Sequence, residues 1–266
     1  MRIAKDSQVD ALTKKAWEEN WSGYATEQAL EIFNYPRVKR QLEIYGDRLP
    51  KDKYILEGGC GIGPYLAHFH GLGYSIIGVD YNVEPLKKIK EFNKNLLVSC
   101  ADVLRLPFKD SSFGAYISLG VIEHFTEGPQ AAIKEAYRVI SDKGYFIVQV
   151  PRISVLRKIK YPLIWLSENS FIRKLFHKEP KTRYWEQYFA VSELSEALKD
   201  GGFLVEAVFP LDHEHAFREF CPFLFGDRKS YDAANKLGVS FGRFAEKFLP
   251  WACADSMVFI CKKETG

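Results

Sequence analysis

The sequence has few cysteines, and their spacing does not suggest a structural site. The five are Cys60, Cys100, Cys221, Cys253 and Cys261, an odd number with no C-x-x-C pair among them. Neither a disulfide framework nor a cysteine zinc site follows from such a distribution. Free thiols are typical of a reducing compartment, so we expect a cytoplasmic protein.

Long apolar runs and a strong charge imbalance are also missing. No stretch reaches the ~18 consecutive apolar residues of a spanning helix, and residues 1–8 lack the apolar core of a secretion signal. We therefore expect neither a membrane-spanning helix nor a secretion signal. The formal net charge is only +3 over 266 residues, whereas nucleic-acid-binding domains are usually basic as a whole. We therefore expect nucleic acid not to be the partner.

Strand-like and helical segments alternate after residue 50. Strands are predicted at 53–57, 74–79, 96–99, 113–118, 145–150, 203–209 and 256–261. Clear helices are predicted at 127–140, before a turn at 142–144, and from an N-cap at Ser192 to Lys199. Because parallel neighbours need a long crossover, this alternation predicts an α/β fold with a doubly wound, mostly parallel sheet. Residues 1–50 read as helical, with a break at Pro36.

Two stretches interrupt the alternation. Residues 152–190 carry nine Lys or Arg against three Glu and many aromatic side chains, and residues 211–253 are rich in phenylalanine. We expect a single domain over 1–266, with an N-terminal helical cap (1–50), a core (51–150) and these insertions as a substrate lid. The first insertion could instead contact anionic membrane lipid or nucleic acid. The second could form a dimer surface.

A glycine turn follows the first predicted strand. Glu57 ends the strand, and Gly59, Gly61 and Gly63 follow at alternate positions, where they allow a sharp turn and close approach of a ligand. Pro64 stands where a dinucleotide fingerprint has its third glycine. The carboxylate of Glu57 would repel a pyrophosphate and attract an ammonium or sulfonium group. NAD therefore fits this turn poorly.

Acids follow the next two strands as well. Asp80 ends the second strand, about 20 residues after the turn, where it would accept hydrogen bonds from ribose hydroxyls. Asp102 follows the third strand and is placed to accept from the amino group of adenine, with Tyr81 and Leu104 on the two faces of the base. The carboxyl ends of parallel strands share one sheet edge, so these residues predict a nucleoside pocket there.

These motifs, together with Ser118 to His124 and Tyr137 to Tyr145, resemble those of the class I S-adenosylmethionine-dependent methyltransferases, most closely the type-11 family of small-molecule enzymes. The resemblance is strong over residues 50–150. It implies a seven-stranded sheet with an antiparallel last strand. It also implies S-adenosyl-L-methionine as cofactor, contacted by residues that the motifs supply: Glu57, Gly59, Gly61, Gly63, Asp80, Tyr81, Asp102, Val103 and Leu119. Positions matching Ile122 and His124 lie close to the donor methyl group in that family.

The acceptor is not identified by these motifs. Ser118-Leu119-Gly120-Val121 stands where enzymes that methylate amino groups of adenine or glutamine carry Asn/Asp-Pro-Pro-Tyr/Phe. This difference favours methyl transfer by direct displacement to O, N or C of a small or lipid-like metabolite. Two alternatives stay open, a non-catalytic cofactor-binding regulatory or assembly protein and a tRNA or other nucleic-acid methyltransferase.

The candidates for acceptor contact lie mostly in the insertions. As catalytic residues we predict His124, Tyr184 and His213. Further candidates for acceptor contact are His177, Trp185, Tyr188 and His215. The spacing His213-x-His215 resembles half of a metal site, but no third ligand is suitably spaced, so we expect no metal.

Overall fold

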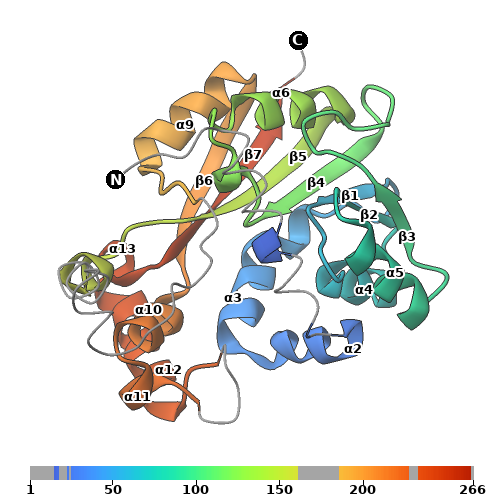
Figure 1. Ribbon diagram of the computed structural model, residues 1–266. Helices are drawn as coiled ribbons and strands as arrows, with labels where there is room; N and C mark the ends of the chain where they lie inside the picture. Colours follow the sequence, from blue (N-terminus) through green and yellow to red (C-terminus); the bar gives the residue numbers. More distant parts are fainter. Residues whose placement is uncertain (1–14, 18–22, 24, 161–185, 228–232, 265–266) are drawn as a thin grey trace. The chain divides into compact units, whose positions relative to one another are not determined.

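The computed structural model describes residues 15–17, 23, 25–160, 186–227 and 233–264 (Figure 1). The central feature is a seven-stranded sheet with the order β3-β2-β1-β4-β5-β7-β6. Its strands are β1 (Ile55–Gly58), β2 (Ile76–Asp80), β3 (Leu97–Cys100), β4 (Phe113–Leu119), β5 (Ile140–Pro151), β6 (Phe203–Leu211) and β7 (Ser256–Lys263). The predicted α/β class and seven-stranded sheet are confirmed.

Five consecutive strands of the sheet, β3-β2-β1-β4-β5, run parallel to one another. β1 pairs with β2 and with β4, β2 pairs with β3, and β4 pairs with β5, all in parallel. Gly58 of β1 is in register with Val79 of β2 and with Ser118 of β4. The carboxyl ends of β1, β2 and β4 therefore lie side by side, and the loops after them share one edge of the sheet.

Helices connect these strands. Their apolar residues recur on one face, which packs against the sheet. Within the core they are α4 (Pro64–Gly71), α5 (Val83–Phe92), α6 (Gln130–Val139) and α9 (Val191–Asp200), with a short 3₁₀ helix, η3 (Ile122–His124), after β4. Figure 1 shows α4 and α5 beside the β1–β3 part of the sheet. The N-terminal region holds α2 (Thr26–Ala29), η1 (Leu30–Asn34), α3 (Pro36–Tyr45) and η2 (Gly46–Arg48).

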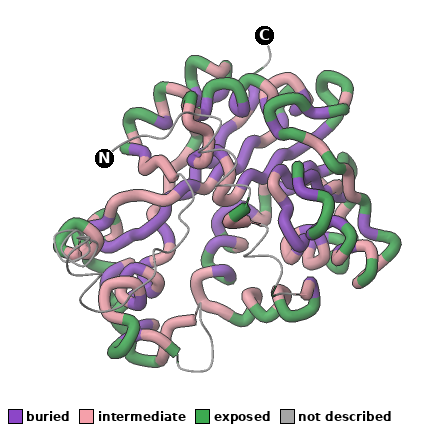
Figure 2. The backbone as a smooth tube through the Cα atoms, in the orientation of Figure 1, coloured by how far each residue is buried: buried purple, intermediate pink, exposed green. Residues whose placement is uncertain are grey.

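The core lies on the central strands. Ile55, Leu56, Ile117 and Ile147 are fully buried, and the strands are accordingly buried along most of their length in Figure 2. Central parallel strands have both faces covered, which explains why they read as continuous apolar runs in the sequence.

Two local predictions need correction, and a third is confirmed. β5 begins at Ile140, directly after α6, because Ile140 pairs with Phe113 of β4; the predicted turn at 142–144 lies inside this strand. The N-cap of α9 is Ala190, so Ser192 lies within the first turn of the helix. Pro36 does interrupt the N-terminal helical region, as the first residue of α3, where its missing N–H costs nothing.

The chain groups into two compact units. One contains Met1–Val150, Tyr184–Phe209 and Val258–Gly266, and the other contains Pro151–Arg183 and Pro210–Met257. The second unit thus joins most of the two predicted insertions. In the described part it includes α10 (His213–Phe220), α11 (Pro222–Phe225), α12 (Lys236–Phe248) and α13 (Pro250–Cys253). The single-domain assignment and the lid role remain predictions.

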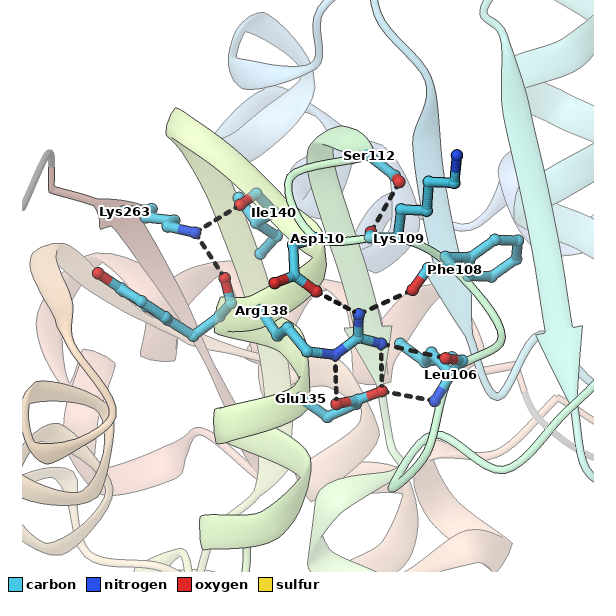
Figure 3. Close-up of polar contacts among 10 residues, drawn as sticks. Leu106, Phe108, Lys109, Asp110, Ser112, Glu135, Arg138, Ile140 and Lys263 are labelled. Atoms are coloured by element: carbon cyan, nitrogen blue, oxygen red, sulfur yellow. Dashed lines mark hydrogen bonds and ion pairs between the residues drawn. The ribbon is translucent and has the colours of Figure 1, made fainter.

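An arginine on α6 fastens the loop between β3 and β4 (Figure 3). The guanidinium of Arg138 donates to the carbonyl oxygens of Leu106 (3.1 Å) and Phe108 (2.7 Å). It also pairs with Glu135 and Asp110, each at 2.7 Å. The carboxylate of Glu135 in turn accepts from the N–H of Leu106 at 2.6 Å. This clamp fixes the loop that begins with the predicted base-binding residues.

Within the described ranges, we find no helix that combines the length and the apolar character needed to cross a membrane.

Candidate functional site

The glycine turn, residues 59–63, joins β1 to α4. Gly59, Gly61 and Gly63 have φ values of 70°, 52° and 70°, in the left-handed region that glycine enters without a steric penalty. A Cβ on Gly59 would lie 2.5 Å from a methyl carbon of Val121. Glycine is therefore favoured at all three points, and at Gly59 a side chain would clash with Val121.

Asp80 ends β2 and holds the turn in place. The residue is 7% exposed, and its carboxylate accepts from the N–H of Gly61 and from the N–H of Asn82, both at 2.9 Å. Burial raises the pKa of this carboxyl, although the same two hydrogen bonds oppose the shift. Asp80 thus has a structural task that the sequence did not indicate. Its predicted contact with ribose remains a prediction.

Glu57 is a buried acid at the end of β1. Its side chain is 5% exposed, and its Oε2 atom has no hydrogen-bond partner among the described residues. Burial raises the pKa of Glu57 to about 8; a backbone hydrogen bond from Leu66 opposes the shift and the neighbouring Asp80 adds to it. A buried acceptor of this kind is costly unless a ligand supplies a donor.

Tyr45, on α3, adds a second orphaned oxygen that the sequence analysis missed. It is fully buried, and its hydroxyl has no partner in the described part of the chain. Its pKa is raised by burial, then by Tyr65 and by Glu57, which places these groups near one another. Its only signal in the sequence is an apolar, helical position, which does not distinguish it from an ordinary core tyrosine.

The predicted base-binding residues lie at the ends of β2 and β3. Tyr81 and Leu104 are 44% and 37% exposed, a high value for large apolar side chains. Asp102 is exposed and accepts at 2.9 Å from the N–H of Leu104, while Val103 is buried. Leu119, the last residue of β4, is partly buried. Their cofactor contacts remain predictions.

His124 ends η3 next to a buried acid. Its Nε2 lies 3.9 Å from Oε1 of Glu123, and its ring meets that of Trp17 edge to face, with centroids 5.5 Å apart. Glu123 is 2% exposed, and its Oε2 has no partner among the described residues. Burial raises its pKa to about 8. The sequence analysis did not identify Glu123 as a candidate site residue, because no pattern in the sequence indicates that its side chain is buried.

The other predicted acceptor residues fall in the second unit, in the first unit and in the part of the chain that is not described. His213 belongs to the second unit, where its Nε2 is 2.8 Å from the carbonyl oxygen of Pro250 and burial lowers its pKa. His215 lies 3.5 Å from Asp255. Tyr188, in the first unit, donates to Glu186 at 2.7 Å. Tyr184, His177 and Trp185 fall outside the described residues, so their roles, like that of His213, remain predictions. In the described segments, no group of three or more His, Cys, Asp or Glu is placed to hold a metal.

Comparison with known proteins places this arrangement in context. Residues 56–148 match the type-11 family model described as "Methyltransferase domain". A protein of Encephalitozoon cuniculi named as a methyltransferase is 30% identical over 179 residues, which cover 66% of this chain and 78% of that protein. A methyltransferase structure from Methanosarcina mazei is 18% identical, with a TM-score of 0.58 over 84% of this chain and 98% of that one.

Other relatives are longer and carry more specific names. "Probable tRNA methyltransferase 9B" of Mus musculus is 36% identical over 137 residues, 50% of this chain and 28% of that protein. The "tRNA (carboxymethyluridine(34)-5-O)-methyltransferase" of Arabidopsis thaliana is 34% identical over 120 residues, 44% of this chain and 27% of that one. This chain thus spans about a quarter to a half of the curated relatives that it matches first.

These names correct one prediction. From the small net charge we expected nucleic acid not to be the partner, and relatives named for tRNA contradict that expectation. The physical reason is that a net charge of +3 sums over the whole chain, whereas contact with phosphates needs only a local group of cations.

Proposed function

The chain belongs to the type-11 family of class I S-adenosylmethionine-dependent methyltransferases, and from this premise we propose that it transfers the methyl group of S-adenosyl-L-methionine to an acceptor. The observation that carries the proposal is the pair of buried acids beside the glycine turn. Asp80 holds the turn through Gly61, and one oxygen of Glu57 has no hydrogen-bond partner in the part of the chain that the structure describes. One acid organises the pocket and the other is available to a ligand.

The residues fit this cofactor. Its ammonium group would supply the donor that Oε2 of Glu57 lacks, and its hydroxyls suit the carboxylate of Asp80. The exposed faces of Tyr81 and Leu104 suit an adenine ring. A sulfonium methyl group is already an activated electrophile, so the bound cofactor supplies the reactive carbon.

The chain's own residues then have to orient and enclose the reactants. Strand order determines the direction in which the cofactor lies. With its nucleoside at β2 and β3, the other end extends across β1 toward β4, because these strands are neighbours in the sheet. His124 and Glu123 follow β4 and so flank the reacting end. Holding the acceptor in line and excluding water is the main catalytic requirement for such a displacement.

For the acceptor, we propose a nucleoside of tRNA. The support is the names of the relatives from mouse and Arabidopsis, which share the core of this chain. A small metabolite is the second candidate. It is favoured by Ser118-Leu119-Gly120-Val121, which lacks the Pro-Pro loop associated with base amino groups.

Calorimetry with S-adenosylmethionine and with its demethylated product tests cofactor binding. Asp80→Ala should weaken binding by about tenfold or more, because charge-assisted hydrogen bonds contribute ~1.5 to 3 kcal/mol each. Glu91→Ala is the matched control, since Glu91 is an exposed acid on α5 outside the predicted pocket. Circular dichroism of both variants checks the fold. No binding by the unmodified protein would refute the proposal.

A labelling experiment tests the acceptor. The protein is incubated with methyl-tritiated cofactor and either bulk tRNA or a nucleic-acid-free metabolite extract, and the tRNA is digested to nucleosides. Label in a nucleoside supports the tRNA proposal, and label only in the metabolite fraction supports the second candidate. Cofactor binding without transfer to either fraction would support a non-catalytic binding protein.

A further inference from the structure

Glu123 is a buried acid to which the proposed methyl transfer gives no role so far. One oxygen, Oε1, lies 3.9 Å from Nε2 of His124, while Oε2 has no hydrogen-bond partner among the described residues. The side chain is 2% exposed. An unpaired polar group this deeply buried reduces stability. Such an arrangement is understandable if a ligand completes it.

The position of Glu123 indicates which ligand that would be. Gly120 directly follows β4, and a Cβ built on it would lie 3.5 Å from Oε1 of Glu123. The carboxyl group therefore lies against the end of β4. This strand is the neighbour of β1 on the side away from β2, where the proposed cofactor has its reacting end. The acceptor must approach from this side. The acceptor is therefore the ligand best placed to supply a hydrogen-bond partner for Glu123.

The surroundings of the carboxyl favour its neutral form. Burial raises the pKa of Glu123 to about 8, and Glu186, in the segment before α9, adds to the shift. That segment is held against Glu123 by the N–H of Gln187, which donates to the carbonyl oxygen of Glu123 at 2.8 Å. Among the residues that the structure describes, the titratable groups next to this carboxyl are His124 and Glu186. A neutral carboxyl carries an O–H and can donate a hydrogen bond.

We propose that Glu123 is an acceptor-binding residue whose carboxyl group donates a hydrogen bond to an oxygen atom of the methyl acceptor. The inference rests on the proposed function. A protonated Glu123 suits a carbonyl or carboxylate oxygen of the acceptor, whereas an ionised Glu123 would repel such an oxygen. In this role Glu123 orients the acceptor and does not remove a proton from it.

Two variants separate hydrogen-bond donation from general base catalysis. Glu123→Gln keeps a donor of similar shape, so kcat and KM for bulk tRNA should stay within about threefold of the original. Its rate should also lose the decline that ionisation of Glu123 causes above pH 8. Glu123→Ala removes the donor and should raise KM about tenfold or more. Calorimetry should show unchanged affinity for S-adenosylmethionine in both.

The outcomes are distinct from those that test the proposed function. If the unmodified protein labels the metabolite fraction instead, the same variants are measured with that fraction. A protein that binds cofactor and labels neither fraction refutes the transfer, and the assignment of Glu123 with it. A protein that transfers methyl groups refutes only the assignment of Glu123 in two cases: Glu123→Gln abolishes kcat, as a general base requires, or Glu123→Ala leaves KM unchanged.

Discussion

At the scale of single residues, the two acids beside the glycine turn differ in the hydrogen bonds that their carboxyl groups receive. Asp80 receives two backbone N–H groups, whereas one oxygen of Glu57 receives none from the described residues. Both pKa values are raised by burial, that of Glu57 to about 8. Glu57 is therefore mostly protonated at neutral pH before a ligand arrives, and a cationic ligand would favour its ionised form.

This difference predicts that cofactor binding releases a proton. At pH 7, docking of the ammonium group beside Glu57 should release close to one proton, and cofactor affinity should rise between pH 6 and pH 8. Calorimetry in phosphate and in Tris, buffers with different ionisation enthalpies, measures the release. Glu57→Gln is the control and should release none at this site. Equal binding enthalpies in the two buffers would contradict the prediction.

At the scale of elements, the clamp on α6 should control the loop between β3 and β4. Arg138→Lys cannot reproduce the forked contacts with Glu135 and with the carbonyl oxygens of the loop. We expect it to lower the free energy of unfolding by roughly 1 to 3 kcal/mol, the range for hydrogen bonds to charged groups. Urea denaturation measures this loss.

Asp110→Ala is the comparison for this clamp. It removes the 77% exposed partner of the same arginine and should cost at most about 1 kcal/mol, because exposed ion pairs contribute little. Equal losses in the two variants would show that the exposed ion pair, and not the contacts to the loop backbone, holds the clamp together.

A second element prediction concerns the contact of α10 with α12. A Cβ on Gly242 would lie 2.8 Å from backbone atoms of Glu214, so the glycine lets the two helices approach. Gly242→Ala should therefore destabilise the second unit by roughly 1 to 3 kcal/mol through overpacking, despite the better helix propensity of alanine. Thermal unfolding measures the effect.

Gly46→Ala is the matched control for this prediction. Gly46 follows α3 with right-handed helical backbone angles, and a Cβ there meets nothing within 4 Å. The substitution should be neutral or stabilise the protein by roughly 0.4 to 1 kcal/mol. A stabilising Gly242→Ala would mean that the helices can separate without cost.

How well the elements could be predicted depends on what determines them. The central strands were found within a few residues because they are buried on both faces and read as apolar runs, as in Phe113–Leu119. The start of β5 was missed because pairing with Phe113 extends it through a local turn signal at Lys143-Gly144. The site acids Glu57 and Asp80 follow from a motif, whereas Tyr45 and Glu123 depend on tertiary burial, which their neighbours in the sequence do not determine.

At the scale of the whole molecule, net charge says less about partners than the distribution of side chains. On α12, Leu237, Phe241, Phe244 and Phe248 recur at helical spacing and are all exposed. Lys236, Arg243 and Lys247 on the same helix are also exposed. Such local groupings disappear in a sum of +3 over the chain. A small net charge is therefore no argument against a nucleic-acid partner.

Buried acids also determine how the stability of the whole protein depends on pH. In the folded state the pKa values of Glu57 and Glu123 are about 8, above the ordinary value near 4.3 of an unfolded chain. The folded state then binds more protons than the unfolded state across this window. The stability associated with these groups is complete below the unfolded pKa and is lost as the pH rises through about 8.

Asp255, in the second unit, acts in the opposite direction. Burial acts to raise its pKa, but hydrogen bonds from His215 and Ser154 and the charge of Arg157 hold the pKa below its usual range. Its contribution is present above the unfolded pKa and is lost in acid. The balance places maximal stability in the mildly acidic range.

The temperature of unfolding should consequently fall by several degrees or more between pH 5.5 and pH 8.5. In the double variant Glu57→Gln/Glu123→Gln this fall should largely disappear, because neither amide titrates. Glu91→Gln, a substitution at an exposed position on α5, serves as control and should follow the unmodified protein. If the unfolding temperature of the double variant falls with pH in parallel with that of the unmodified protein, the two carboxyl groups are already ionised in the folded state. Water would then hydrate them.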